Sequence, residues 1–201
     1  PAFFPAQLDQ YGPQVCLIDA AGVAYSYTTV LERSDSWAAQ LGPLRQLVFI
    51  EGRNSVASIA AYIGSLRAGH VVHLVDPDKP EAATALASTY QAHVLVRCPL
   101  EADTAEIERL HNTPLALHPD LAVLLSTSGS TGAQKLVKLS WQNLQANTAS
   151  ILSYLEMQPS DRAITTLKPH YSFGLSIINT HLAIGGSLVL CERSLQDPSF
   201  W

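Results

Sequence analysis

A short apolar run at residues 121–125 leads directly into six consecutive small or hydroxyl-bearing residues, 126–131, and this junction strongly constrains the fold. The apolar run predicts a buried strand, and the residues after it predict a loop rich in hydroxyl and backbone N–H groups. Glycines let such a loop approach a ligand closely, and successive N–H groups can surround an anion. Lys135 adds positive charge nearby. The segment therefore indicates either a phosphate-binding loop or a flexible Ser/Gly-rich connector.

Two well-known phosphate-binding motifs do not fit the spacing of this loop. A P-loop has Gly before its lysine and Ser or Thr after it. Here Gln134 precedes Lys135, and Leu136 follows it. The dinucleotide fingerprint G-x-G-x-x-G is also incomplete, because Gly129 and Gly132 supply only its last spacing. If the loop binds phosphate, it belongs to a different class.

The order of residues 127–135, T-S-G-S-T-G-A-Q-K, resembles the signature loop of the adenylate-forming enzymes, approximately T-S-G-S/T-T-G-x-P-K-G. That superfamily includes the acyl-CoA synthetases, the adenylation domains of nonribosomal peptide synthetases, and firefly luciferase. Three further segments resemble family segments in the same order: residues 22–30, 66–80 and 171–190. The resemblance thus extends over nearly the whole chain.

The chemistry that this resemblance implies is the activation of a small carboxylic acid. The carboxylate attacks the α-phosphorus of ATP, pyrophosphate leaves, and the acyl-AMP then passes its acyl group to a thiol of CoA or of a carrier-protein phosphopantetheine. Mg²⁺ and cationic side chains neutralise the charge in such reactions. The resemblance implies that Lys135 is the catalytic cation. It places the ATP-phosphate contacts on Thr127, Ser128, Gly129, Ser130, Thr131, Gly132 and Lys135.

The resemblance also suggests where the acyl group would bind. Tyr171 falls at an aromatic-or-histidine position that borders the acyl pocket in relatives, and Phe173 and Gly174 would shape the wall of that pocket. His170 is adjacent, but counting back from Gly185 favours Tyr171. The alternative interpretation of Tyr171 is an ordinary half-buried tyrosine. The residues give no indication of which acid is bound.

Two departures from the family loop leave a second hypothesis open. Gln134 replaces the usual proline and so removes a rigid φ constraint. Leu136 places a side chain where the family has glycine and a close backbone approach. A non-catalytic nucleotide-binding or interaction domain that retains the fold is therefore the alternative to an enzyme.

Apolar runs alternate with helical patterns along the chain. The predicted strands are residues 46–51, 71–75, 93–96, 121–126, 164–167 and 188–191. The predicted helices are residues 54–67 with Asn54 as the cap, 80–90, 140–154 with Ser140 as the cap, and 176–184. This alternation predicts an α/β fold of mostly parallel sheets with helices on both faces, in which loops after strands bind ligands. Residues 99–119 are expected to form a variable connector.

By analogy with the family, residues 46–160 are expected to form the lobe with the phosphate loop. Residues 1–45 and 161–201 would form part of a second lobe. The family's later adenylate-binding segment, ribose-binding aspartate and C-terminal catalytic lysine have no counterparts in the 201 residues. We therefore expect a truncated N-terminal domain that lacks the C-terminal domain and is inactive, or nearly so, on its own.

Net charge, hydropathy and cysteine content exclude some classes of function and indicate a cellular location. The net charge is −5 without a Lys/Arg cluster, which argues against a nucleic-acid partner. The sequence contains no apolar run near the roughly 20 residues of a membrane span, and its start lacks the pattern of a signal peptide. Three widely spaced cysteines indicate reduced thiols of a cytoplasmic protein. His70 and His73 are not expected to share a metal, because a three-residue offset along a strand places them on opposite faces.

Overall fold

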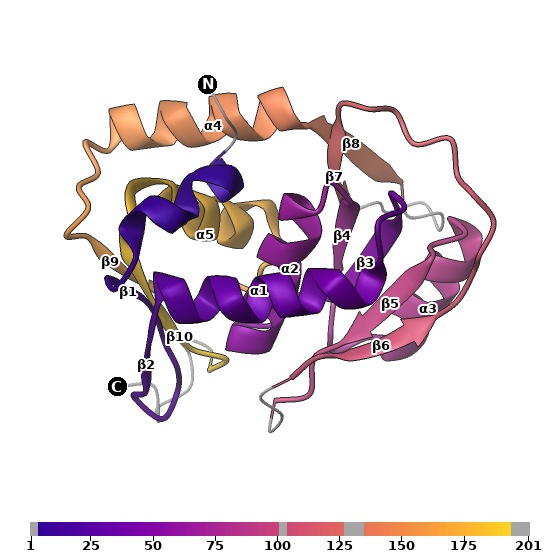
Figure 1. The fold of residues 1–201 in the computed structure, drawn as a ribbon, viewed down its shortest axis with the longest axis horizontal. Helices are drawn as coiled ribbons and strands as arrows, with labels where there is room; N and C mark the ends of the chain where they lie inside the picture. The colour runs from indigo at the N-terminus through magenta and orange to yellow at the C-terminus, as the bar shows by residue number, and fades with distance from the viewer. Residues whose placement is uncertain (1–3, 101–103, 127–134, 194–201) are drawn as a thin grey trace.

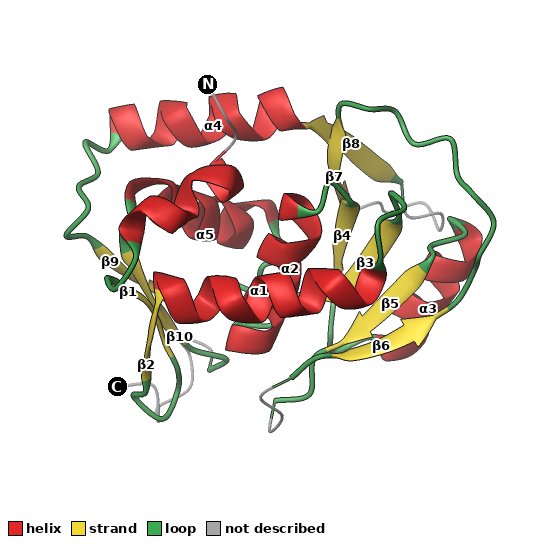
Figure 2. Cartoon of the chain, in the orientation of Figure 1, coloured by secondary structure: helices red, strands yellow, loops and turns green. Residues whose placement is uncertain are grey.

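The computed structural model describes residues 4–100, 104–126 and 135–193. Two β-sheets lie toward opposite ends of the long axis, and helices α1, α2 and α5 lie between them (Figures 1 and 2). Helix α3 covers the outer side of one sheet, and α4 runs along one edge of the molecule. This arrangement confirms the predicted α/β fold of mostly parallel sheets.

The first sheet has four strands in the order β2-β1-β10-β9. Strands β1, β10 and β9 are parallel, and β2 pairs antiparallel with β1. Both ends of the described chain contribute to it. Its strands are β1 (Val15–Ile18), β2 (Ala24–Ser26), β9 (Arg162–Thr165) and β10 (Ser187–Leu190).

The second sheet has six strands in the order β6-β5-β3-β4-β7-β8. Its four central strands are parallel, and the two edge strands run antiparallel to their neighbours. The strands are β3 (Leu47–Glu51), β4 (Val71–Val75), β5 (Val94–Arg97), β6 (Glu106–Arg109), β7 (Leu121–Ser126) and β8 (Leu136–Ser140). Because they all come from the middle of the chain, the sheet membership agrees with the expected lobe boundaries, although the division into lobes stays a prediction.

The remaining elements of the described chain are five α-helices and the short 3₁₀ helix η1. They are η1 (Phe4–Tyr11), α1 (Tyr27–Leu41), α2 (Val56–Arg67), α3 (Pro80–Thr89), α4 (Trp141–Tyr154) and α5 (Ser172–Ile184). The predicted cap of α4 is confirmed, because Ser140 and Asn143 form a reciprocal capping box. Helix α2 is buried from Val56 to Leu66, which makes it the central element of the core.

Several sequence predictions were wrong in detail. Residues 99–119 are not only a connector, because they include β6, which pairs with β5. Strand β6 is exposed and rich in charge, so its sequence lacks the apolar pattern that indicates a buried strand. The cap of α2 is Ser55, whose hydroxyl accepts from the Ser58 N–H, and not Asn54. The Asn54 amide instead donates to the carbonyls of Thr165 and Cys191. Strands β1, β2 and β8 and helix α1 have no counterpart among the predicted elements. Strand β9 covers Arg162–Thr165 and not residues 164–167, and α5 begins before residue 176.

Candidate functional site

A cavity of about 430 Å³ lies where β4 and β7 end and α5 begins. Val75 and Asp76 contribute to it from the end of β4, Ser126 from the end of β7, and Tyr171 from the start of α5. Alanine and leucine side chains of α3 form its apolar wall. Ligands of parallel α/β sheets bind outside the carboxyl ends of the strands, so this cavity is the candidate site.

The predicted phosphate loop joins two strands at this edge. Ser126 at the end of β7 pairs with Leu136 at the start of β8. Lys135 is exposed and immediately precedes β8. The other predicted phosphate contacts lie outside the described residues: Thr127, Ser128, Gly129, Ser130, Thr131 and Gly132. Their assignment stays a prediction, but β7 ends at the cavity wall with Ser126, and β8 begins with its partner Leu136.

The three predicted acyl-pocket residues occupy different positions. Tyr171 lines the cavity and is about half exposed. Phe173 is 63% exposed, and Gly174 is buried. A methyl group on Gly174 would overlap the Lys168 carbonyl oxygen and lie 2.7 Å from that of Leu167. The fold therefore requires a glycine there because α5 packs tightly against the chain that precedes it, and among the described residues neither Phe173 nor Gly174 lines this cavity.

His170 lines the cavity but was not selected from the sequence. Its side chain is only 10% exposed, and its Nε2 lies 4.0 Å from an Asp76 carboxylate oxygen. Neither ring nitrogen has a hydrogen-bond partner among the described residues. Burial lowers the pKa of His170, while the Asp76 carboxylate opposes that shift. His170 is therefore a buried imidazole at the cavity wall, close to an anionic side chain.

Comparison with known proteins decides the family. Residues 4–201 match the family model for AMP-binding enzymes. The chain belongs to the AMP-binding enzyme family. This confirms the resemblance that the sequence indicated, since the matched range contains all four motif segments.

Individual AMP-binding relatives are similar over most of this chain. The D-alanine–D-alanyl carrier protein ligase of Streptococcus equi subsp. equi (strain 4047) is 28% identical over 209 residues, which cover 92% of this chain and 41% of that protein. Tyrocidine synthase 3 of Brevibacillus parabrevis is 25% identical, over 98% of this chain and 3% of that protein. The chain thus spans less than half the length of these relatives.

A solved structure shows the same fold. The crystal structure of ATP-bound MatB from Rhodopseudomonas palustris superposes with a TM-score of 0.74 at 22% identity. The superposition covers 98% of this chain and 46% of that one. At this identity the similarity establishes the fold alone.

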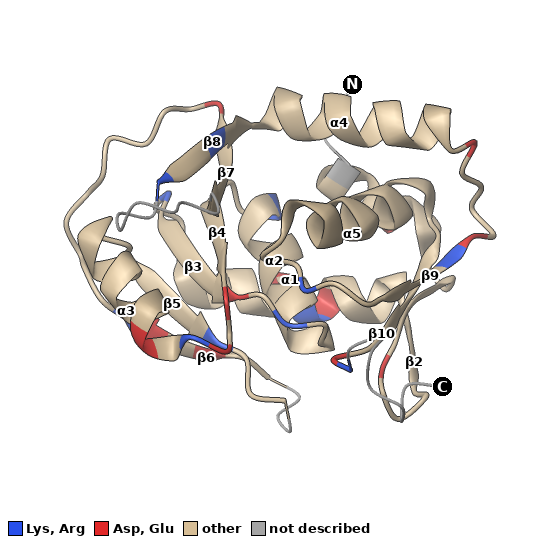
Figure 3. Ribbon diagram, turned by 180° about the vertical axis from the view of Figure 1, so that it is seen from behind, with Lys and Arg blue, Asp and Glu red and all other residues tan. Residues whose placement is uncertain are grey.

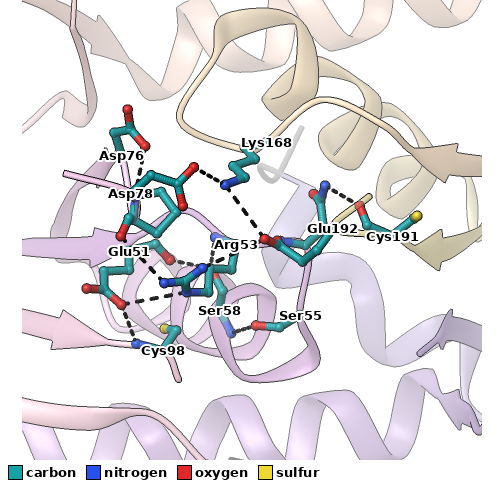
Figure 4. Close-up of polar contacts among 12 residues, drawn as sticks. Glu51, Arg53, Ser55, Ser58, Asp76, Asp78, Cys98, Lys168, Cys191 and Glu192 are labelled. Atoms are coloured by element: carbon teal, nitrogen blue, oxygen red, sulfur yellow. Dashed lines mark hydrogen bonds and ion pairs between the residues drawn. The ribbon is translucent and has the colours of Figure 1, made fainter. Parts of the chain in front are cut away.

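Beside the cavity of the AMP-binding chain, charged side chains bridge the two sheets (Figure 4). Lys168 Nζ lies 2.6 Å from Asp78 Oδ2 and 3.8 Å from Glu192 Oε2. Across the same junction, Arg53 Nη1 is 3.8 Å from Glu192. Within the six-stranded sheet, the buried Glu51 carboxylate lies 3.2 Å from Arg97. Lys168 is therefore engaged with carboxylates in this structure, and it joins the connection before α5 to the loop after β4.

The remaining electrostatic features are unexceptional. Figure 3 shows acidic and basic residues interspersed along the ribbon. Within residues 4–100, 104–126 and 135–193, the His, Cys, Asp and Glu side chains do not assemble into a group of three or more suited to a metal ion. In the same ranges, no helix is long and apolar enough to cross a membrane.

Proposed function

We propose that this AMP-binding chain is the N-terminal part of an ATP-dependent ligase that activates a small carboxylic acid as acyl-AMP and releases pyrophosphate. The observation that carries the proposal is the position of the described residues that flank the Ser/Gly segment. Ser126 ends β7 at the carboxyl edge of the parallel sheet, where it lines the cavity and pairs with Leu136 at the start of β8. Ligand-binding loops occupy this edge in α/β folds.

In this proposal, Lys135 supplies the fixed positive charge beside the departing pyrophosphate. Its exposure next to the start of β8 suits a side chain that contacts a soluble polyanion. An ammonium group donates charge-assisted hydrogen bonds to phosphate oxygens, which stabilises the negative charge that develops as the bond to the α-phosphorus breaks. The hydroxyl and backbone N–H groups of Thr127, Ser128, Gly129, Ser130, Thr131 and Gly132 would contact the same phosphates.

Mg²⁺ would neutralise phosphate charge when bound. The described residues do not provide a three-ligand acidic or imidazole site for the ion. Tyr171, at the cavity wall, is the residue that we propose to border the acyl group. The acyl acceptor would be a thiol of CoA or of a carrier-protein phosphopantetheine. The thiols of Cys16, Cys98 and Cys191 are free, which suits a cytoplasmic protein.

Acid-dependent ATP–pyrophosphate exchange tests this function in the full-length protein. Replacing Lys135 by Ala should reduce exchange at least about tenfold, because a charge-assisted contact to the leaving group is lost. The matched control is Lys138→Ala, which removes a nearby exposed lysine of β8. Equal exchange by the wild type and the Lys135 variant would remove Lys135 from the mechanism. If the full-length protein binds ATP but no acid supports exchange, the alternative of a non-catalytic nucleotide-binding domain is favoured.

The 201-residue chain needs a separate assay. We propose that it is inactive alone, since the rest of the family's site would lie in the remaining part of the full-length protein. Robust acid-dependent exchange by the isolated chain would contradict this part of the proposal without affecting the rest.

A further inference from the structure

His73 is the one polar residue of β4, whose other residues are Val71, Val72, Leu74 and Val75. Its side chain is fully buried, and the ring of Phe49 packs against it edge-on with centroids 4.7 Å apart. A buried polar group costs free energy unless it is hydrogen-bonded, and a branched apolar residue would suit this strand position. The presence of an imidazole therefore requires a physical explanation.

Both ring nitrogens of His73 contact β7. Nδ1 lies 2.8 Å from the Leu124 carbonyl oxygen, and Nε2 lies 3.3 Å from the Ser126 hydroxyl. A carbonyl oxygen can only accept, so the proton of the neutral ring is on Nδ1. Nε2 is then an acceptor, and the Ser126 hydroxyl donates to it. Burial lowers the pKa of His73 to about 4, which keeps the ring neutral at physiological pH.

This contact controls a side chain of the candidate site. Ser126 is the last residue of β7, it lines the cavity, and the next described residue is Lys135. Because its proton is directed at His73, the hydroxyl is held in one rotamer and offers only acceptor capacity to a ligand. The Leu124 carbonyl fixes the orientation of the His73 ring. The pairing of β4 with β7 therefore determines how the Ser126 hydroxyl is oriented at the cavity wall.

We propose that His73 is a positioning residue, which orients the Ser126 hydroxyl and thereby fixes the end of β7 where ATP binds. This inference rests on the proposed function, because it assigns the contact to the ATP side of the reaction. It requires His73 and Ser126 to act as one unit, with His73 making no contact to ATP.

Kinetics of ATP–pyrophosphate exchange by the full-length protein test the role. His73→Val and Ser126→Ala should each raise the KM for ATP about fivefold to tenfold, the size expected from one lost hydrogen bond, with a smaller change in kcat. The double variant should be no worse than either single variant, because both remove the same interaction. Additive effects, or an unchanged KM for His73→Val, would overturn the inference.

His70→Asn provides the matched control. His70 is also fully buried, but it precedes β4 and accepts from the Gln46 N–H at the opposite end of the strand. An asparagine oxygen can accept the same bond, so the KM for ATP should not change. A KM increase equal to that of His73→Val would mean that any lost imidazole loosens the sheet, and would contradict a positioning role.

Nitrogen-15 NMR of the 201-residue chain separates this inference from the proposed function. The His73 ring should show the Nδ1–H tautomer, and Ser126→Ala should shift the Nε2 resonance while leaving the His70 signals in place. If the Nε2 resonance does not shift when Ser126 is replaced, the hydrogen bond itself is disproved. If the NMR result is as expected but the full-length protein neither binds ATP nor catalyses exchange, the proposed function fails, and the assigned role of the bond fails with it.

Discussion

Lys168 Nζ lies 2.6 Å from Asp78 Oδ2, and this contact joins the connection between β9 and α5 to the loop after β4. The two residues are attached to different sheets and are 90 positions apart in the chain. Glu192, which follows β10, shares the same ammonium group at 3.8 Å. The carboxyl edges of both sheets therefore meet at one ionic junction beside the cavity.

Replacing Lys168 by Met should lower the free energy of unfolding only modestly. Asp78 is 65% exposed, and ion pairs of this kind contribute about 0.2–1 kcal/mol. The difference between the variant and the wild type should shrink in about 1 M NaCl, because salt screens exposed charges. Urea unfolding at low and high salt measures both effects, with Lys138→Met as the exposed control. A difference that does not depend on salt would mean that packing of the methylene groups, and not charge, is responsible.

Gly64 should resist replacement by alanine although it lies inside a helix. Helix propensity alone favours alanine by about 1 kcal/mol. The methyl group would, however, overlap the Ser34 carbonyl oxygen of α1 and lie 3.1 Å from the Trp37 ring. Overpacking costs about 1–3 kcal/mol, and a backbone carbonyl cannot move aside as a flexible side chain would. After the gain in helix propensity is subtracted, we expect a net loss of up to about 2 kcal/mol, measured by urea unfolding.

The control for Gly64→Ala is Ser36→Ala on the exposed side of α1. It improves helix propensity without adding a contact, so it should be neutral or slightly stabilising. If Gly64→Ala proved as stable as the wild type, α1 and α2 would have to separate at little cost, and the close packing would contribute little to stability.

The sequence predicts the buried strands well and the long-range polar contacts poorly. Apolar runs such as β3 and β4 are recognisable because both faces of a parallel strand are buried. The edge strand β6 is charged and exposed, so it carries no such signal. Both Asn54 and Ser55 are suitable caps for α2, and only the Thr165 and Cys191 carbonyls, more than 100 residues away, decide between them.

The same difference between local sequence patterns and long-range contacts applies to the candidate site. The Ser/Gly loop is recognisable because its residues are consecutive. The pairing of His73 with Ser126 is not, since 53 positions separate them and only the β4–β7 register brings them together. A histidine within an otherwise apolar strand was the available signal, and by itself it identified no partner.

Acidification should destabilise the protein before its carboxylates titrate. Burial lowers the pKa of His70 to about 4 from 6.5, with smaller contributions from Arg45 and His93, and burial lowers that of His73 to about 4 as well. At a pH between the unfolded-state pKa of 6.5 and the folded-state pKa of about 4, the unfolded chain binds protons on these histidines and the folded chain does not. The free energy of unfolding therefore falls as the pH falls from about 6.5 toward about 4. The loss should be on the order of 2 kcal/mol per histidine at about pH 5.

Urea unfolding at about pH 7.5 and at about pH 5 measures this loss. His70→Asn replaces a titrating acceptor by one that does not titrate, so it should remove the contribution of His70, on the order of 2 kcal/mol, from the pH dependence. Equal stability of the wild type at the two pH values would show that the folded protein protonates these histidines as readily as the unfolded chain does, so that their pKa values are not lowered by folding.

Alkylation should distinguish Cys191 from the other two cysteines. The thiolate is the reactive species, and burial raises the pKa of Cys16 and of Cys98 to about 12. The Glu51 carboxylate, which accepts from the Cys98 N–H, further disfavours a negative charge there. Cys191 is partly exposed, so native protein treated with iodoacetamide should gain a single label at that residue, identified by peptide mass spectrometry. In urea all three thiols should react, and comparable labelling of Cys98 in the native protein would show that the end of β5 opens far more readily than its burial implies.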